Sequence, residues 1–353
     1  MGQRFFVTGG AGFIGSNLVH HLLERDSLAQ VLVYDKLTYA GNLDNLAAVA
    51  DHPRYRFVLG DICDRKLVRS TLEDFRPTVV YNLAAESHVD RSIDEPGEFV
   101  RTNVIGTFEM LEGARALASK PPGAGFRFIH VSTDEVYGSL GAQGAFTEES
   151  RYAPSSPYAA SKAAADHLVR AYARTYGLPV ITTNCSNNFG PYQFPEKLIP
   201  LLVLNALEGK PLPVYGDGQN VRDWLYVGDH CEALHLVAHK GEPERSYNIG
   251  GRSERTTLEI THAVCDLLDE LAPRASGSHR DHVRLVPDRP GHDRRYAIDP
   301  GRIERELGWR PATRFLDGLR RTIEWYLAHR SWCDRITQGV YRRERLGLMG
   351  APR

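Results

Sequence analysis

The sequence predicts an α/β protein with a doubly wound, mostly parallel sheet and a smaller, mixed α/β lobe. Short apolar runs alternate with amphipathic stretches through the first half of the chain, which is the pattern of strands and the helices that cover them. A glycine-rich turn follows the first of these runs. Beyond Asn187, proline and glycine become dense and the alternation turns irregular, so we expect the second lobe there.

The glycine-rich turn contains Gly9, Gly12 and Gly15, which together with Gly10 give both the G-x-G-x-x-G and the G-x-x-G-x-x-G spacing. Glycine at these points permits a tight turn, lets backbone amides approach a pyrophosphate, and lets the next helix pack close to the sheet. That helix is expected to begin near Phe13 and to aim its positive end at the pyrophosphate. The order of strand, turn and helix therefore predicts a Rossmann dinucleotide-binding site.

The second strand ends in Asp35, about twenty residues after the last glycine of the turn. A carboxylate at this point bonds the adenosine ribose hydroxyls and repels a 2′-phosphate, so NAD is expected rather than NADP. Lys36 is the neighbouring feature that would favour a phosphate.

The remaining elements follow from the same periodicity. Strands are expected over residues 4–8, 31–34, 57–59, 78–83, 126–131 and 180–183, and helices from residue 13, over 65–75, over 99–118, and from the Tyr158 region to residue 176. We assign residues 1–187 to the dinucleotide-binding domain, with a return of the chain to the sheet at about 223–249. Residues 188–222 and 250–353 form the second lobe.

Composition excludes several classes of protein. The chain is 42% hydrophobic and 25% charged, which suffices for a large core, and a net charge of −1 gives no overall field that would recruit nucleic acid or an anionic membrane. The five cysteines are scattered without a C-x-x-C pair, so free thiols are expected and no metal site is predicted. No signal peptide or long apolar span is visible, and we expect a cytoplasmic protein.

Polar and small residues follow several predicted strands, at the edge where such sheets bind ligands. Asp61 and Ile62 could contact the adenine ring, although Asp61 could equally cap the next helix. Small residues would let backbone lie against a cofactor in the run Leu83-Ala84-Ala85.

Four further polar residues are open to two interpretations. Ser87 and His88 could touch the nicotinamide or the substrate, although a single loop histidine is more often structural. Thr102, with Asn103, could be a polar position within a helix or could help to position Tyr158.

Two pairs of residues carry the predicted chemistry. Tyr158 and Lys162 are four residues apart and share one face of a helix, where the ammonium is expected to lower the pKa of the phenol. Asp134 and Glu135 follow a strand and offer a second acid and base, unless they only cap a surface turn. One pair suits removal of a hydroxyl proton during hydride transfer, and the other suits moving water on and off a carbon. We therefore predict an internal redox reaction coupled to an elimination.

The chain also resembles a known family over nearly its whole length. The matching segments are GGAGFIGS, DKLTYAGN, GDICD, LAAESHVDRS, VSTDEVYG, SPYAASKA, NCSNNFGPYQFPEKLIP, YGDGQNVRDWLYV, YNIGG and DRPGHDRRYAID. They resemble the extended short-chain dehydrogenases, and within these the nucleoside-diphosphate-sugar 4,6-dehydratases. The specific element is Thr133-Asp134-Glu135, because sugar 4-epimerases lack the Asp-Glu pair and GDP-mannose dehydratases carry no aspartate at this point. Phe189 and Thr257 depart from the usual tyrosine and polar amide.

The resemblance implies a role for each residue of the catalytic set. Tyr158 would remove the C4 hydroxyl proton with help from Lys162, while Thr133 would bond the C4 oxygen. Glu135 would abstract the C5 proton, and a protonated Asp134 would donate to the departing C6 hydroxyl. The product would be a 4-keto-6-deoxy sugar.

The resemblance also implies two sets of contacts. The full set of residues expected to contact NAD includes those predicted above. It consists of Gly9, Gly12, Phe13, Ile14, Gly15, Asp35, Lys36, Leu37, Thr38, Gly41, Asp61, Ile62, Leu83, Ala84, Ala85, Ser87, Thr102, Tyr158, Lys162 and Asn187. The nucleotide sugar would contact Ser87, His88, Thr133, Asp134, Glu135, Asn188, Lys197, Leu198, Pro213, Tyr215, Arg222, Arg289 and His292.

The implied substrate is dTDP-glucose, on a route to rhamnose or another deoxysugar. A dehydratase of another nucleotide sugar (UDP- or CDP-glucose, or an acetamido sugar) and a non-catalytic NAD-binding scaffold are the alternatives.

A homodimer is also expected, because two predicted helices carry apolar residues on more than one face. These residues are Val100, Val104, Phe108, Met110 and Leu111 on one helix, and Ala159, Ala163, Ala164, Leu168 and Val169 on the other. C-terminal segments of the same chain could cover that face instead.

Overall fold

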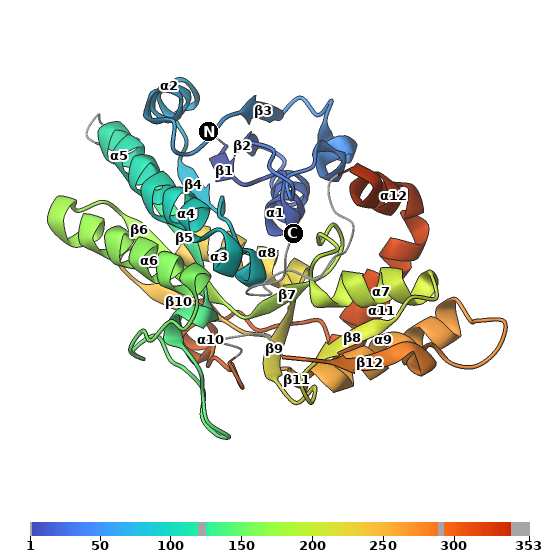
Figure 1. The fold of residues 1–353 in the computed structure, drawn as a ribbon. Coiled ribbons are helices and arrows are strands. Elements are labelled where there is room, and N and C mark those ends of the chain that lie inside the picture. The colour runs from blue at the N-terminus through green and yellow to red at the C-terminus, as the bar shows by residue number, and fades with distance from the viewer. Residues whose placement is uncertain (1, 119–124, 289–292, 340–353) are drawn as a thin grey trace.

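The structure is a computed structural model that describes residues 2–118, 125–288 and 293–339. A seven-stranded parallel sheet has the order β10-β6-β5-β4-β1-β2-β3 (Figure 1). Its strands are β1 (Arg4–Thr8), β2 (Gln30–Asp35), β3 (Tyr55–Leu59), β4 (Val79–Asn82), β5 (Arg127–Thr133), β6 (Val180–Cys185) and β10 (Ser246–Ile249). The predicted doubly wound sheet is confirmed.

Helices cover both faces of this sheet, and alternate side chains of each strand serve the two faces. Phe5 and Val7 of β1 pack on the side of α1 (Phe13–Arg25) and α8 (Val227–Lys240). Phe6, between them, packs on the opposite side. The helices of that side are α2 (Arg65–Phe75), α5 (Thr107–Ala118) and α6 (Pro157–Tyr176).

The predicted helix over residues 99–118 is in fact built of three pieces. A short helix α4 (Pro96–Phe99) leads into a π-helical stretch η2 (Val100–Gly106), and α5 follows it. Asn103 in the π-helical stretch bonds both backbone groups of Glu86, accepting from its N–H at 2.9 Å and donating to its carbonyl at 2.9 Å. π-Helical segments are frequent near functional sites, and here the segment adjoins the loop after β4.

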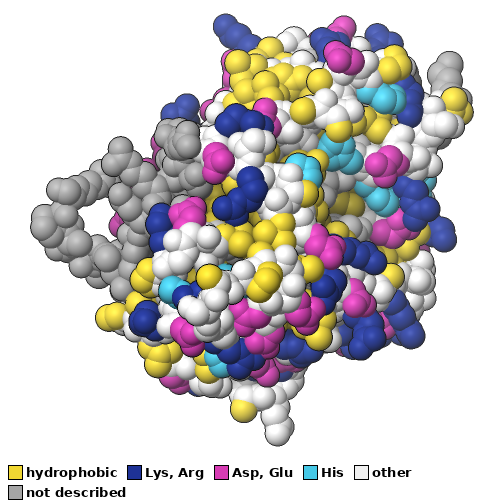
Figure 2. All heavy atoms as spheres, turned by 90° about the vertical axis from the view of Figure 1, so that its right-hand side faces the viewer, with side chains coloured by type: hydrophobic (Ala, Val, Ile, Leu, Met, Phe, Trp, Pro, Cys, Tyr) yellow, Lys and Arg dark blue, Asp and Glu magenta, His cyan; other side chains and the backbone are white. Residues whose placement is uncertain are grey.

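The second lobe contains two small sheets. One has the order β11-β9-β7, with β7 (Asn187–Phe189), β9 (Val221–Tyr226) and β11 (Glu254–Thr256); the other pairs β8 (Leu212–Tyr215) with β12 (Val283–Val286). The helices of this lobe are α7 (Leu198–Leu207), α9 (Thr257–Leu271), α11 (Phe315–Ala328) and α12 (Arg330–Gly339). They share a core around Phe189, Leu202, Leu268 and Tyr326. Positive and negative side chains are interspersed on the face that these helices present (Figure 2).

The predicted return of the chain to the large sheet is shorter than expected. β9 pairs with β7 and β11, so residues 223–226 belong to a small sheet, and only α8 and β10 return. β10 extends the large sheet because it pairs in parallel with β6. The assignment of the other residues to two lobes stays a prediction.

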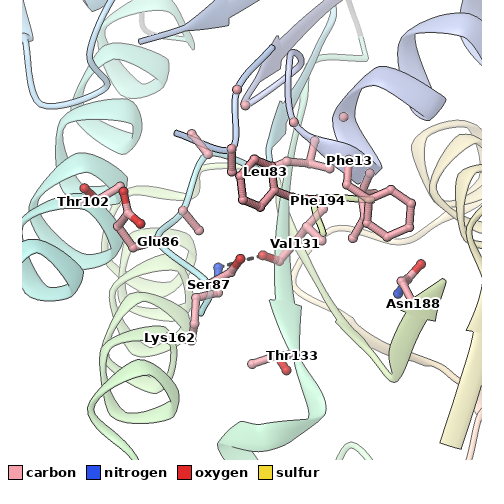
Figure 3. A pocket seen from close by; sticks show the side chains of 18 of the residues that line it. Phe13, Leu83, Glu86, Ser87, Thr102, Val131, Thr133, Lys162, Asn188 and Phe194 are labelled. Atoms are coloured by element: carbon pink, nitrogen blue, oxygen red, sulfur yellow. Dashed lines mark hydrogen bonds between the residues drawn. The ribbon is translucent and has the colours of Figure 1, made fainter. Parts of the chain in front are cut away.

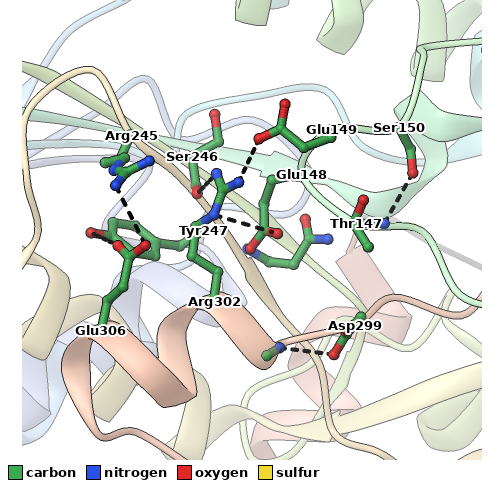
Figure 4. Close-up of polar contacts among 12 residues, drawn as sticks. Thr147, Glu148, Glu149, Ser150, Arg245, Ser246, Tyr247, Asp299, Arg302 and Glu306 are labelled. Carbon is green, nitrogen blue, oxygen red and sulfur yellow. Dashed lines mark hydrogen bonds and ion pairs between the residues drawn. The ribbon is translucent and has the colours of Figure 1, made fainter.

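The loop that follows β5 is fastened to the C-terminal half of the chain (Figure 4). Arg302 in α10 (Gly301–Leu307) donates to the carbonyl of Ser246 and pairs with Glu148 and Glu149. Glu148 in turn accepts from the backbone N–H of Asn248 at 2.9 Å. The segment before α10, which contains Tyr296, is joined to the same loop: the N–H of Leu140 donates to the carbonyl of Arg295, and that of Phe146 donates to the carbonyl of Ala297.

Candidate active site

A cavity of about 300 Å³ opens at the carboxyl ends of β1, β4, β5 and β6 (Figure 3). Of the residues predicted to bind cofactor, it is lined by Gly9, Gly12, Phe13, Ile14, Gly15, Asp35, Lys36, Thr38, Gly41, Ile62, Leu83, Ala84, Ala85, Ser87, Thr102, Tyr158, Lys162 and Asn187. Of those predicted for substrate, it is lined by Ser87, Thr133, Asp134, Glu135, Asn188 and Lys197. The two sets thus meet in one pocket.

The glycine turn lines the pocket with backbone, and at Gly9 and Gly15 there is no room for a side chain. Gly9 has φ of +68°, and a Cβ there would lie 2.8 Å from backbone atoms of Ala84. A Cβ on Gly15 would lie 2.2 Å from the carbonyl oxygen of Gly9. Gly12 is the N-cap of α1 and lines the pocket, so the start of the helix faces the cavity. This cradle fits a pyrophosphate.

Asp35 stands at the end of β2 and is 8% exposed. Its carboxylate accepts from the backbone N–H of Ala11 at 3.0 Å and of Leu37 at 2.8 Å, which fixes its orientation toward the pocket. Lys36 lies 3.7 Å from the carboxylate of Asp61 and donates to the hydroxyl of Thr102. Because Lys36 pairs with a carboxylate of the protein, it is not free to bind a 2′-phosphate. Asp35 is the group that would contact the ribose hydroxyls. This arrangement fits NAD better than NADP.

Leu37 and Asp61 are not among the residues that line the cavity, and their contact with NAD stays a prediction. Leu37 has φ of +54°, and its N–H donates to the carboxylate of Asp35. Asp61 accepts from the N–H of Cys63 and lies 3.7 Å from the ammonium of Lys36, which itself lines the pocket.

The predicted catalytic residues converge at the far end of the cavity. Thr133 ends β5, and the 3₁₀ turn η3 (Asp134–Tyr137) places Asp134 and Glu135 directly after it. The Thr133 hydroxyl donates to Asp134 at 3.3 Å and accepts from the N–H of Glu135 at 3.3 Å. Tyr158 and Lys162 lie one turn apart on α6 and line the same pocket.

The environment of Asp134 favours its protonated form. Burial, followed by the nearby carboxylates of Glu135 and Asp223, raises the pKa of Asp134 well above its usual value. The residue is 2% exposed, and the second oxygen of its carboxyl group has no hydrogen-bond partner among the described residues. A buried, protonated carboxyl with a free oxygen is suited to donate a proton.

The predicted effect of Lys162 on Tyr158 is not what the protein by itself shows. Burial, followed by the charge of Glu135, raises the pKa of the Tyr158 phenol, while a hydrogen bond from Thr133 acts in the opposite sense. Lys162 donates to the carbonyl of Val131 at 2.8 Å, and burial lowers its own pKa. Desolvation thus dominates the pKa of Tyr158 in the protein alone, and the lowering of that pKa by Lys162 stays a prediction.

Several predicted substrate contacts lie outside the cavity lining: His88, Leu198, Pro213, Tyr215 and Arg222. His88 is the N-cap of α3 (Val89–Asp94) and accepts from the N–H of Arg91. This is a structural role, the alternative that the sequence left open for this histidine. Arg222 donates to the carbonyls of Val221 and Asp293, and its guanidinium lies 4.3 Å from the centre of the Tyr296 ring. Its charge acts on Asp134, so it stands near the catalytic pair. Arg289 and His292 lie outside the described residues.

Some lining residues were not predicted: Tyr34, Ala40, Gly60, Glu86, Val131, Ser132, Cys185, Ser186, Gln193, Phe194 and Glu196. Glu86 and Glu196 each precede a predicted contact, Ser87 and Lys197, so the same motifs contained their signal. Tyr296 also belongs near the site, since the charge of Glu135 acts on its phenol. Tyr296 lies within the matching segment DRPGHDRRYAID, so that motif contained its signal as well.

Two searches of the described residues bear on other classes of site. Within residues 2–118, 125–288 and 293–339, no group of three or more His, Cys, Asp and Glu side chains is placed to hold a metal ion. None of the helices in these ranges has the length and apolar character needed to cross a bilayer.

Known proteins resemble the chain over nearly its full length. The model of the family described as GDP-mannose 4,6 dehydratase matches residues 6–322. A dTDP-glucose 4,6-dehydratase of Neisseria meningitidis serogroup B is 55% identical over 98% of this chain and 99% of its own length. The dTDP-glucose 4,6-dehydratase 1 of Escherichia coli K12 is 52% identical over 96% of this chain and 97% of its own.

Solved structures agree with these relatives. A dTDP-glucose 4,6-dehydratase from Streptomyces venezuelae, crystallised with NAD bound, has a TM-score of 0.87 and 49% identity over 94% of this chain and 99% of its own. A UDP-glucose 4-epimerase from Thermus thermophilus, in complex with NAD, has a TM-score of 0.81 but only 32% identity, over 92% and 99% of the two chains. The chain therefore belongs to the dTDP-glucose 4,6-dehydratase family of NAD-dependent extended short-chain dehydrogenases.

Proposed function

We propose that this chain converts dTDP-glucose to dTDP-4-keto-6-deoxyglucose and water, in the biosynthesis of a deoxysugar. The observation that carries the proposal is the Thr133-Asp134-Glu135 turn in one pocket with Tyr158 and Lys162. The nucleotide and the sugar come from the relatives, because dTDP-glucose dehydratases match at 52 to 56% identity over more than nine-tenths of the chain.

NAD supplies a hydride acceptor for the sugar C4 and, later, the hydride donor for C6. The residues that would hold it are the glycine turn under the pyrophosphate and Asp35 at the ribose. Because the hydride taken from C4 returns to C6, the cofactor ends each turnover as it began.

In the first step, Tyr158 removes the proton of the C4 hydroxyl as C4 becomes a ketone. Thr133 holds the C4 oxygen, since its hydroxyl lies at the end of β5 between Asp134 and Glu135. Lys162 places its positive charge in the same buried region and stabilises the phenolate as it forms.

In the second step, the C4 ketone acidifies the C5 proton, and Glu135 removes it. Asp134 gives its proton to the C6 hydroxyl, which leaves as water because hydroxide alone is a poor leaving group. The proton needed is on Asp134 beforehand, since burial and two neighbouring carboxylates favour the neutral acid. After hydride delivery to C6, a proton returns to C5 and completes the 4-keto-6-deoxy product.

The decisive experiment is incubation of the protein with a panel of nucleotide sugars. dTDP-glucose should give a product lighter by one water, detected by mass spectrometry, and UDP-glucose, CDP-glucose and acetamido sugars should give little. Tyr158→Phe should bind dTDP-glucose nearly as well and yield none of this product. Faster turnover of another nucleotide sugar would establish that alternative, and bound NAD without turnover of any would establish a scaffold.

Two further parts of the proposal concern the setting of the enzyme. The chain works in the cytoplasm, where its nucleotide-sugar substrate is found. The reducing conditions there keep its five cysteines as free thiols. It also pairs with a second copy through the segment of residues 96–118 and α6, which lie side by side on one side of the molecule (Figure 1).

The apolar surface available for this dimer is narrower than the sequence suggested. Met110, Leu111, Ala159, Ala163 and Val169 are buried within their own chain. Val100 and Ile105 remain exposed on the π-helical stretch, and they are the centre of the proposed contact.

A further inference from the structure

A buried carboxylate, Asp166, lies behind the catalytic residues and outside the pocket lining. It follows Lys162 by four residues on α6, so the two side chains share the face of the helix that packs on β5 and β6. The residue is 1% exposed. Burying an unpaired carboxylate at this depth would cost free energy of folding, so the groups that pair with Asp166 indicate its role.

Asp166 is the centre of a polar network that ties α6 to three other segments. One oxygen accepts from the hydroxyls of Ser132 and Tyr152, each at 2.9 Å, and lies 3.5 Å from the side-chain nitrogen of Asn184. The other oxygen lies 3.3 Å from Nε2 of His130. Asn184 also donates to the carbonyl of Thr133 at 3.2 Å, so the network reaches the catalytic strand end.

Lys162 is held against the same strand from the pocket side. Its ammonium donates to the carbonyl of Val131, the residue before Ser132 (Figure 3). The lysine and the carboxylate thus flank one short segment of β5, residues 131–132, from two positions on the same helix. In this dry region a positive charge needs a nearby negative charge to persist.

We propose, on the basis of the proposed function, that Asp166 is a positioning residue that keeps Lys162 positively charged and holds α6 in register with the end of β5. Loss of the carboxylate charge would leave the effect of burial on Lys162 opposed only by Cys185. The lysine would then release its proton at lower pH, and the phenolate of Tyr158 would lose its stabilising charge.

The groups around the pair agree with this role. Burial lowers the pKa of Lys162, and Asp166 on α6 and Cys185 on β6 act against that shift. Burial also opposes the charge of Asp166, yet His130, Lys162 and Ser132 outweigh it and its pKa is lowered. Other titratable neighbours are Tyr158 on α6, Tyr137 on η3 and Tyr152 on the loop before α6, and burial raises the pKa of each phenol. For Tyr137 and Tyr152 the charge of Asp166 reinforces this shift, and the charge of Arg170 on α6 opposes it.

The test is the pH dependence of the first half-reaction in Asp166→Asn, which keeps the shape and removes the charge. Reduction of the bound cofactor by dTDP-glucose is followed in single turnovers by the absorbance of the reduced nicotinamide. Because Asp166 raises the pKa of Lys162, its loss should move the alkaline limb of the rate to lower pH by about one unit. The KM for the sugar nucleotide should stay within about twofold, because Asp166 does not line the pocket.

Three controls separate charge from shape and from general damage. Tyr152→Phe removes a hydrogen bond to Asp166 but no charge, and Asp229→Asn removes a buried carboxylate of α8 that bonds Thr313 far along the chain. Both should keep the alkaline limb of the wild type. Asp166→Glu restores the charge and should restore the limb even if kcat falls, and it serves as the test if Asp166→Asn does not fold.

Each outcome decides between the proposals. An alkaline limb unchanged in Asp166→Asn, or displaced equally in Asp166→Glu, would overturn the role of Asp166. If none of the nucleotide sugars reduces the bound cofactor of the wild type, the proposed function fails instead. In that case the charge of Lys162 can still be followed by the pH dependence of amine modification, mapped by mass spectrometry, in wild type and variant.

Discussion

At the scale of single residues, two adjacent carboxylates occupy different environments. Asp134 is buried, with one oxygen lacking a hydrogen-bond partner among the described residues, whereas Glu135 is only partly buried. Environments that separate two carboxyl groups in this way let one serve as acid and the other as base. The division of roles rests on burial as well as on the order of residues in the chain.

Glu135→Gln separates the two halves of the reaction. The amide cannot remove the C5 proton, so bound NAD should still be reduced by dTDP-glucose while product formation falls by about 10²- to 10⁴-fold. Stopped-flow absorbance and product analysis measure the two steps on one sample. Normal turnover in a correctly folded variant would exclude Glu135 as the base.

Asp134→Asn should lower the activity and raise the melting temperature, and the change in melting temperature should depend on pH. The pKa of Asp134 is raised in the folded protein, so the folded state retains a proton that the unfolded chain releases above about pH 4. The stability that this group contributes is present below that pH and is lost as the pH rises. Because the amide mimics the neutral acid, the variant should melt at a higher temperature than the wild type at pH 7 and at the same temperature below about pH 4.

Thermal melting across this pH range checks the sign of the effect. A variant less stable than the wild type at pH 7 would contradict a neutral Asp134. Its elimination step should also slow more than its oxidation step.

At the scale of elements, the pocket is made by the connections between strands and helices. The glycine turn between β1 and α1 is so close to the loop after β4 that a side chain at Gly9 would meet Ala84. The π-helical stretch η2 holds the same loop through Asn103, which also donates to the hydroxyl of Ser161 at 2.8 Å. Ser161 donates to the carbonyl of Tyr158, so the network reaches the catalytic helix. The interpretation of Asn103 as support for Tyr158 thus has a physical path.

Two alanine substitutions in the glycine turn should have different effects. In Gly15→Ala the new Cβ would lie 2.2 Å from the carbonyl oxygen of Gly9, so the variant should lose several degrees of melting temperature or fail to fold. In Gly12→Ala the nearest atom is 3.3 Å away and the methyl group borders the pocket, so the fold should survive while NAD affinity falls by tenfold or more. Calorimetry and cofactor titration distinguish the two. Equal loss of stability in both would show that the turn serves packing alone.

At the scale of the whole molecule, the two lobes meet around the pocket. Glu196 accepts from Arg91 at 3.1 Å and from the Tyr39 hydroxyl at 3.0 Å, and the Arg91 guanidinium lies over the Tyr39 ring. Lys197, next to it, donates to the carbonyl of Ser87 at 2.9 Å. These contacts bring the segment before α7 against loops of the nucleotide-binding half. The pocket is therefore lined by residues from both halves of the sequence.

The proposed dimer gives a prediction at the same scale. Light scattering should report a mass near twice the 39.5 kDa of the chain. The double variant Val100→Glu and Ile105→Glu should shift the protein toward the monomer, because it places charges on the only strongly exposed large apolar side chains of the described residues 96–118. Leu285→Glu, on β12, changes a still more exposed apolar residue elsewhere and should leave the mass unchanged. A fully active wild-type monomer would contradict the dimer.

The sequence by itself determined six of the seven strands of the large sheet and most of the pocket that they border. Its strands and its helix over residues 65–75 are local patterns, because the alternation of apolar residues is enforced over a few neighbouring positions. Gly9, Gly15 and Asp35 were also recognisable, since a tight turn and a strand end leave little freedom in residue type. The Asp134-Glu135 pair and the spacing of Tyr158 and Lys162 identified the chemistry in the same local way.

Only the tertiary structure decided which charges those groups meet. The pairing of β9 with β7 depends on contacts between distant segments, as does the approach of Tyr296 to the site. The same holds for the pKa of Tyr158, which is governed by burial and by Glu135 rather than by spacing to Lys162. Desolvation is a property of everything packed around a group, so no stretch of neighbouring residues can encode it.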